Sequence, residues 1–124
     1  MKCMLTVLLL LGASPAFILT DEEIREAYHD SYKYEIAGSF MNAIKALLPV
    51  YHEYPKTYTV NLRLGWLYHS NKNYANSLAH YDTAVKIAPY SLEAKLGRLL
   101  PLLAQEKYKQ VEREAFRILN TDYY

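Results

Sequence analysis

The sequence predicts an all-α protein, an α-solenoid of three antiparallel helix hairpins, and three observations lead to this fold class. The first is a repeat of 34 residues, a period typical of a helix–turn–helix unit. The residues in phase are Tyr34 and Tyr68, Pro55 and Pro89, Phe40 with Tyr74 and Tyr108, and Ala43 with Ser77 and Val111. The second is a set of helix-start signals, and the third is a proline closing two of the repeats. At 124 residues, the chain has the length of one domain.

The first helix has the most complete start signal. Thr20 is placed as its N-cap, and Glu23, three residues further on, completes a capping box. Leu19 and Ile24 occupy the two positions of a hydrophobic staple. Continuing along the chain, we expect helices at about 21–36, 40–53, 58–70, 74–87, 91–105 and 108–120.

Serine and prolines mark later boundaries. Ser91 is placed as a second N-cap. Pro55 and Pro89 follow the second helices of their repeats, because the residue before a proline disfavours helical backbone. Pro101 instead falls inside the fifth expected helix, four residues after Gly97. Either Gly97 leaves room for a bend at Pro101 that widens a groove, or the last repeat simply departs from the pattern.

The segment 61–89 resembles the tetratricopeptide repeat, whose pattern is W-x2-L-G-x2-Y, then A-x3-F, then P. The matching residues are Leu64, Gly65, Tyr68, Tyr81, Ala84 and Pro89, whereas Asn61 replaces the tryptophan and Ser77 the alanine. The first repeat resembles the pattern through Tyr34, Ala43, Leu47 and Pro55, and the third is the weakest, with Leu99 in the glycine position. The resemblance implies a right-handed superhelix with repeats at about 24–57, 58–91 and 92–124, within a domain at 17–124.

The third expected helix has two apolar faces. Leu64, Gly65 and Tyr68 share one face, on which Gly65 lets the partner helix approach closely, with Tyr81 and Ala84 as the expected contacts. The chain's single tryptophan, Trp66, lies on the opposite face. In tetratricopeptide arrays the first helices of the repeats line a concave groove, and the resemblance places the Trp66 face there.

Extending the Trp66 face to the other repeats gives a peptide-binding groove, with Glu35 continuing its stripe in the first helix. Its expected residues are Arg25, Tyr28, Tyr32, Leu62, Arg63, Trp66, His69, Leu96 and Leu100. Such a groove would grip an extended or helical peptide by its apolar side chains. The alternative is that these residues pack repeat against repeat, and for the leucines that alternative is favoured.

The segment 1–16 has the layout of a secretory signal peptide. Lys2 precedes an apolar run and the small-residue segment "GASPA", with cleavage expected after Ala16. A membrane anchor is the alternative, but Gly12 and Pro15 interrupt a run that is already short for spanning. The mature chain would hold no cysteine and would have no net formal charge, so it would bind neither nucleic acid nor an anionic membrane through bulk charge. We therefore expect an exported protein, periplasmic or extracellular.

No pattern in the sequence is typical of an enzyme, a metal site or a cofactor site. His29, His52, His69 and His80 lack metal-ligand spacing and are interpreted as surface histidines. There is no glycine-rich phosphate loop, G-x-S-x-G or H-E-x-x-H motif. The 13 tyrosines leave open a polysaccharide-binding module, in which the aromatic rings stack on sugars.

The last expected helix carries apolar residues that a following repeat would cover. Phe116, Leu119, Tyr123 and Tyr124 form a candidate end-on interface. The expected function is a non-enzymatic protein- or peptide-binding adaptor or scaffold of the cell envelope. The alternatives are a module that self-associates or docks through this end, as the first part of a longer repeat array would, and the polysaccharide-binding module.

Overall fold

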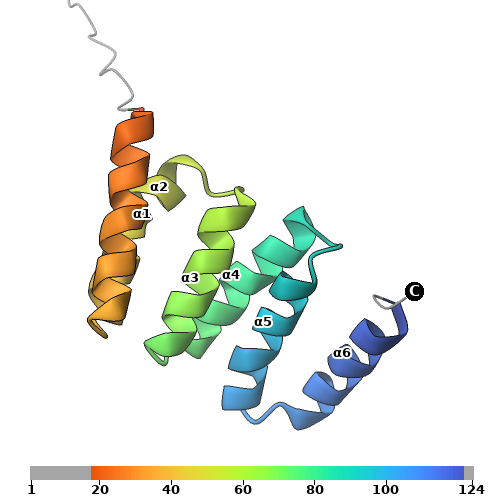
Figure 1. Cartoon of the computed structure of the whole chain (residues 1–124). Helices are drawn as coiled ribbons and strands as arrows, with labels where there is room; N and C mark the ends of the chain where they lie inside the picture. Colours follow the sequence, from red (N-terminus) through yellow and green to blue (C-terminus); the bar gives the residue numbers. More distant parts are fainter. Residues whose placement is uncertain (1–17, 122–124) are drawn as a thin grey trace, which may run out of the picture.

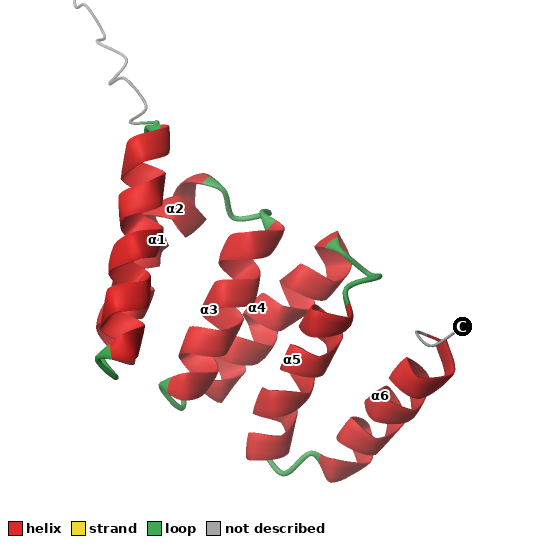
Figure 2. Cartoon of the chain, in the orientation of Figure 1, coloured by secondary structure: helices red, strands yellow, loops and turns green. Residues whose placement is uncertain are grey.

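The computed structural model describes residues 18–121, so the expected signal peptide and both Tyr123 and Tyr124 lie outside the described residues. The helices are α1 (Asp21–Ile36), α2 (Phe40–Glu53), α3 (Tyr58–Ser70), α4 (Tyr74–Ile87), α5 (Leu92–Ala104) and α6 (Tyr108–Thr121). Each expected helix is found to within one residue at either end. Between residues 18 and 121 there is only helix and connecting loop (Figure 2).

Consecutive helices pack against one another along the whole array. Contacts join α1 to α2, α2 to α3 and so on to α6, and α3 also touches α5. The hairpins α1–α2, α3–α4 and α5–α6 therefore follow one another in a row (Figure 1). The predicted all-α solenoid of three helix hairpins is confirmed.

The turn inside each hairpin repeats with the 34-residue period of the sequence. Gly38, Lys72 and Glu106 all have positive φ, at 75°, 63° and 58°. In each turn the N–H of the next residue donates to a carbonyl five residues back, the bond of a Schellman motif. These bonds are Ser39 to Tyr34 and Asn73 to Tyr68, both 2.8 Å, and Lys107 to Leu102, 3.0 Å. The repeat thus holds at the level of single hydrogen bonds, including in the third repeat, where the sequence signal is weakest.

Both predicted N-caps are present. The Thr20 hydroxyl accepts a hydrogen bond from the Glu23 N–H at 3.1 Å, and the Ser91 hydroxyl accepts one from the Ala94 N–H at 3.2 Å. Just before the first cap, the Leu19 N–H donates to both carboxylate oxygens of Glu53, at 3.1 and 2.8 Å. This contact ties the start of α1 to the end of α2.

The main core lies between the first hairpin and α3. Its buried residues come from α2 and α3, and Leu19 and Ile24 of the expected staple pack against it. The members are Ala43, Ile44, Leu47, Val50, Val60, Leu64 and Leu67. Fully burying an aliphatic side chain of this size contributes about 1.5–3 kcal/mol, so this junction of two hairpins supplies much of the fold's stability.

The Tyr81 ring of α4 lies between α3 and α5, against two glycines. A Cβ on Gly65 would come within 2.9 Å of this ring, and one on Gly97 within 2.3 Å. The predicted close approach at Gly65 is confirmed. In one of the two explanations of Pro101, Gly97 leaves room for a bend; in the structure its missing side chain accommodates the Tyr81 ring. Pro101 is fully buried, and α5 continues to Ala104. A second proline, Pro49, lies inside α2 and was not anticipated.

The two polar residues that replace the alanine and the tryptophan of the repeat pattern are buried and hydrogen-bonded. Ser77, in the alanine position, donates to the Gly65 carbonyl at 2.6 Å. Asn61, in the tryptophan position, donates from Nδ2 to the carbonyls of Pro55 and Thr57, at 2.9 and 2.8 Å. It thereby fixes the loop that joins the first two hairpins to the start of α3.

His80 is not a surface histidine. Its Nδ1 lies 3.0 Å from the Asn61 Oδ1, which must accept because the Asn61 amide already donates twice, so Nδ1 carries the proton. Its ring stacks on Tyr68 at 5.4 Å and meets the edge of Tyr51 at 4.9 Å. Burial lowers the pKa of His80. The expectation failed because helical periodicity gives the face on which a residue lies but not the side chains that other helices, here α3 and α2, bring to that face.

Among the described helices, none combines the length and the apolar character needed to cross a membrane.

Candidate functional site

A hollow lies on the side of the array formed by the first helix of each hairpin. Its volume is about 400 Å³, and we call it the first-helix hollow. Residues from α1, α3 and α5 line it, together with one from α4. They are Tyr32, Glu35, Leu62, Arg63, Trp66, Tyr81, Glu93, Gly97 and Leu100.

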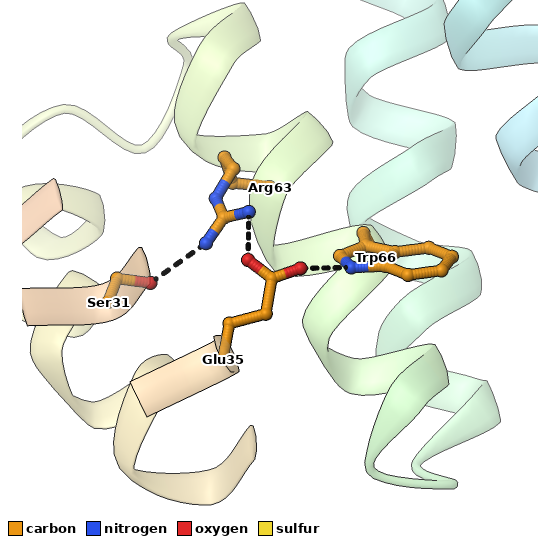
Figure 3. Close-up of polar contacts among 4 residues, drawn as sticks. All are labelled: Ser31, Glu35, Arg63 and Trp66. Carbon is orange, nitrogen blue, oxygen red and sulfur yellow. Dashed lines mark hydrogen bonds and ion pairs between the residues drawn. The ribbon is translucent and has the colours of Figure 1, made fainter. Parts of the chain in front are cut away.

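Glu35 of α1 holds two side chains of α3 in place (Figure 3). One carboxylate oxygen lies 2.7 Å from Nη1 of Arg63, and the other accepts a hydrogen bond of 2.6 Å from the Trp66 indole N–H. Nη2 of Arg63 in turn donates to the Ser31 hydroxyl at 3.1 Å. The orientation of the indole is therefore set by the neighbouring hairpin before any ligand arrives.

Arg63 is held by side chains of α1 and is not available as a free cation. Its side chain is 13% exposed and that of Glu35 is 22% exposed, so the ion pair is largely withdrawn from water. The guanidinium carbon also lies 4.0 Å from the centre of the Tyr32 ring, a cation–π contact. The charge of Arg63 is thus balanced within the chain.

Two aromatic side chains remain open at the hollow. Trp66 is 41% exposed and Tyr32 is 48% exposed. An aromatic ring held by a hydrogen bond at one edge and open over much of its surface is a typical anchor site for an apolar or planar group. His69 extends this aromatic surface, with its ring 6.1 Å from that of Trp66 and 5.8 Å from that of Tyr74. Burial lowers the pKa of His69, which favours the neutral ring at this position.

The α5 side of the hollow carries two polar groups without partners. Tyr81 is 3% exposed as a whole residue, and its hydroxyl, which keeps some contact with solvent, makes no hydrogen bond to any residue between 18 and 121. Burial, with a smaller contribution from the nearby Glu93 charge, raises the pKa of Tyr81 to about 12. Glu93 itself is exposed and forms no ion pair within that same range of residues.

Five of the nine expected groove residues line the first-helix hollow. They are Tyr32, Leu62, Arg63, Trp66 and Leu100. Of the others, Arg25 forms an exposed ion pair with Glu22, at 3.1 Å. Tyr28 packs against the main core, and its pKa is raised chiefly by that burial.

The remaining two expected residues also lie outside the hollow. His69 lies beside Trp66 but does not line it. Leu96, 48% exposed, lines a separate depression between α5 and α6.

Sequence reasoning placed Glu35 on the stripe without a partner, and it missed the roles of Tyr81, Glu93 and Gly97 in the hollow. A signal for α5 was available, because Glu93, Gly97 and Leu100 follow the i, i+4, i+7 spacing of one helix face. The stripe was instead carried to Leu96, one position away. The role of Tyr81 had no such signal, since it reaches the hollow from a second helix.

The expected end-on residues of α6 are open to solvent. Phe116 is 69% exposed and Leu119 is 59% exposed, whereas Ile118, facing α5, is 7% exposed. The other two members, Tyr123 and Tyr124, lie outside the described residues. The described part of this end is therefore apolar and uncovered.

Within residues 18–121, no three histidine, cysteine, aspartate or glutamate side chains come together in a way that could hold a metal ion. Comparisons of the chain with protein-family models, with curated proteins and with solved structures find no match.

Proposed function

We propose that this protein is a non-enzymatic adaptor that binds a segment of another protein in the first-helix hollow. The observation that carries the proposal is the Trp66 indole, which is open to solvent but held in one orientation by Glu35. The resemblance to tetratricopeptide repeats supports the same surface, since their first helices line the ligand groove. The 34-residue recurrence of the turns adds to that resemblance.

A fixed aromatic ring favours binding because little side-chain freedom is lost when the ligand arrives. Immobilising a flexible side chain at an interface opposes binding by about 0.5–1.5 kcal/mol. The Glu35 bond removes that penalty for Trp66 in advance, and the Arg63 contact does the same for Tyr32. Large, preorganised aromatic side chains are typical of the few residues that dominate an interface. The segment 1–16 predicts export, so we propose that the binding takes place in the cell envelope.

The proposal is tested with short random peptides displayed on phage and selected on the immobilised chain. Trp66 is the only tryptophan, so its fluorescence reports directly on the hollow during titration with the selected peptides. We expect Trp66→Ala, measured by calorimetry because this variant has no tryptophan, to weaken their binding by at least tenfold, as for a central aromatic anchor. Tyr108→Ala is the matched control, because Tyr108 is 62% exposed on α6, away from the hollow. Equal affinity of both variants would place the binding surface elsewhere.

A second function is supported by the open face of α6. Phe116 and Leu119 expose apolar surface side by side with little of the helix buried, which is typical of a helix that docks on another surface. Under this proposal the chain associates with a copy of itself or with a partner through α6. Light scattering across a concentration series would then show species larger than one chain, and Phe116→Glu would return them to single chains. A single-chain mass at every concentration would count against self-association.

A further inference from the structure

The charges that line the first-helix hollow do not cancel. Three charged residues line it, namely Glu35, Arg63 and Glu93. Glu35 and Arg63 neutralise one another at 2.7 Å. Glu93 is left with an uncompensated negative charge among the described residues. The hollow is therefore net negative, and its charge lies on the α5 side.

The Tyr81 hydroxyl lies close to this charge. The ring carbon that bears the hydroxyl is 2.7 Å from where a Gly97 Cβ would stand, so it packs against the backbone of α5. Gly97 is one helical turn from Glu93 and lines the same hollow. The Tyr81 side chain is 3% exposed, but its hydroxyl is not sealed from solvent, and Tyr81 lines the hollow, so a ligand there can supply the partner that no described residue provides.

Glu93 by itself has another explanation. It lies in the first turn of α5, where the helix dipole stabilises an acidic side chain. The helix dipole does not explain the unpartnered Tyr81 hydroxyl or the two open rings opposite. The combination of an acceptor, a carboxylate and an aromatic face is what a cationic side chain requires.

Building on the proposed peptide binding, we propose that the first-helix hollow is a subsite for a lysine or arginine side chain of the bound segment. The cation lies against the Glu93 carboxylate, and one of its N–H groups donates to the Tyr81 hydroxyl. The aliphatic stem, or the flat face of a guanidinium, packs on the Trp66 indole. Acidic segments are disfavoured, because Arg63 is already engaged by Glu35 and offers no free positive charge.

The test uses the same selection from random displayed peptides, read as residue enrichment at each position. We expect one lysine or arginine position in the selected peptides, and replacing it with glutamine should weaken binding about tenfold. Glu93→Gln should reduce the affinity of the basic peptide by about the same factor and leave that of its glutamine version unchanged. The matched control is Glu112→Gln, which makes the same charge change on the exposed surface of α6.

Tyr81→Phe removes only the hydroxyl and keeps the ring between Gly65 and Gly97. We expect it to weaken the basic peptide about threefold and to leave the folded structure intact, as judged by circular dichroism. Peptides that bind, depend on Trp66 and show no basic position would overturn the cation subsite while preserving the proposed function. Peptide binding that is independent of Trp66, or no binding at all, would overturn both.

Discussion

Tyr81 is the residue on which the middle of the fold and the hollow both depend. Its ring fills the space left by two missing Cβ atoms, on Gly65 of α3 and Gly97 of α5. At an ordinary exposed helix position, replacing glycine with alanine stabilises by about 1 kcal/mol. Here the added carbon would meet a buried ring at 2.3 Å, so overpacking outweighs helix propensity.

We therefore expect Gly97→Ala to lower the free energy of unfolding by about 1–3 kcal/mol. The measurement is urea unfolding followed by circular dichroism. The effect should shrink in the Tyr81→Leu background, where the ring that clashes is gone, and this coupling is the control. If Gly97→Ala raised the stability of the chain that keeps Tyr81, the ring would not fill the space between α3 and α5 as described.

The buried His80 makes the fold sensitive to acid. Its pKa is lowered in the folded chain by burial, whereas in the unfolded chain it returns to its ordinary value near 6.5. Below pH 6.5 the unfolded chain therefore binds more protons than the folded one, and the folded state loses stability as the pH falls. The imidazole that would become charged lies against the Tyr51 and Tyr68 rings, and its Nδ1–H donates to the Asn61 side chain.

We expect urea unfolding to show a lower stability at about pH 5 than at about pH 7.5, with His80→Gln removing much of the difference. His69, whose pKa is also lowered by burial, would account for part of what remains. The control is His52→Gln, at an exposed position on α2, which should keep the slope of the unmodified chain. An unchanged slope in His80→Gln would refute this assignment.

The residues that lie on one face were predictable from the sequence, but the contacts between faces were not. Helical spacing placed Leu62 and Trp66 on one face of the third helix, the resemblance to tetratricopeptide repeats joined Tyr32 to that face, and all three line the hollow. The hydrogen bond from Trp66 to Glu35 crosses 31 positions and joins two repeats, and no local pattern encodes such a contact. Glu93 was missed because the groove stripe of the third repeat was carried through Leu96 instead of through Glu93 and Gly97.

At the scale of the helices and turns, the hairpin turns differ in how well the residue at the left-handed position suits that backbone. Gly38, Lys72 and Glu106 adopt the same left-handed backbone, which opposes any residue other than glycine by about 1 kcal/mol. The first turn satisfies this requirement and the other two do not.

Lys72→Gly and Glu106→Gly should each raise the free energy of unfolding by about 0.5–1 kcal/mol. Gly38→Ala should lower it by a similar amount, although a Cβ at that position meets nothing within 4 Å. The Lys72 and Glu106 side chains form no hydrogen bond or ion pair among the described residues, so the three changes report chiefly on the backbone preference. Differential scanning calorimetry measures all three, and opposite signs for the glycine-adding and glycine-removing variants are the required result.

Helix boundaries were predictable to within one residue because local signals at some of them are extended to the others by the repeat. The Thr20 and Ser91 caps mark the starts of α1 and α5, the prolines at 55 and 89 follow the ends of α2 and α4, and the 34-residue phase carries these positions to the other repeats. The internal prolines were harder to interpret, since a local rule against proline inside a helix is outweighed by packing. The Pro101 ring is buried in the tertiary structure, and α5 remains one helix around it.

At the scale of the whole molecule, stability is unevenly distributed along the array. In a solenoid each hairpin contacts only its neighbours, so a hairpin in the middle is stabilised from both sides. Five residues of α3 are buried but only Ile118 of α6 is. A helix with little buried apolar surface opens locally at a lower free energy than one with much. The α6 end of the array should therefore open more easily than the middle.

Hydrogen exchange followed by mass spectrometry should therefore show the slowest amides in α3 and α4 and the fastest helical amides in α6. Ile118→Ala, which removes the only buried residue of α6, should speed exchange in α5 and α6 and leave α1 and α2 unchanged. If exchange in all six helices responded equally, the array would open as one cooperative unit. If α6 were protected as strongly as α3 and lost that protection on dilution, its exposed face would be covered by a second chain, and the assembly function would take precedence over the hollow.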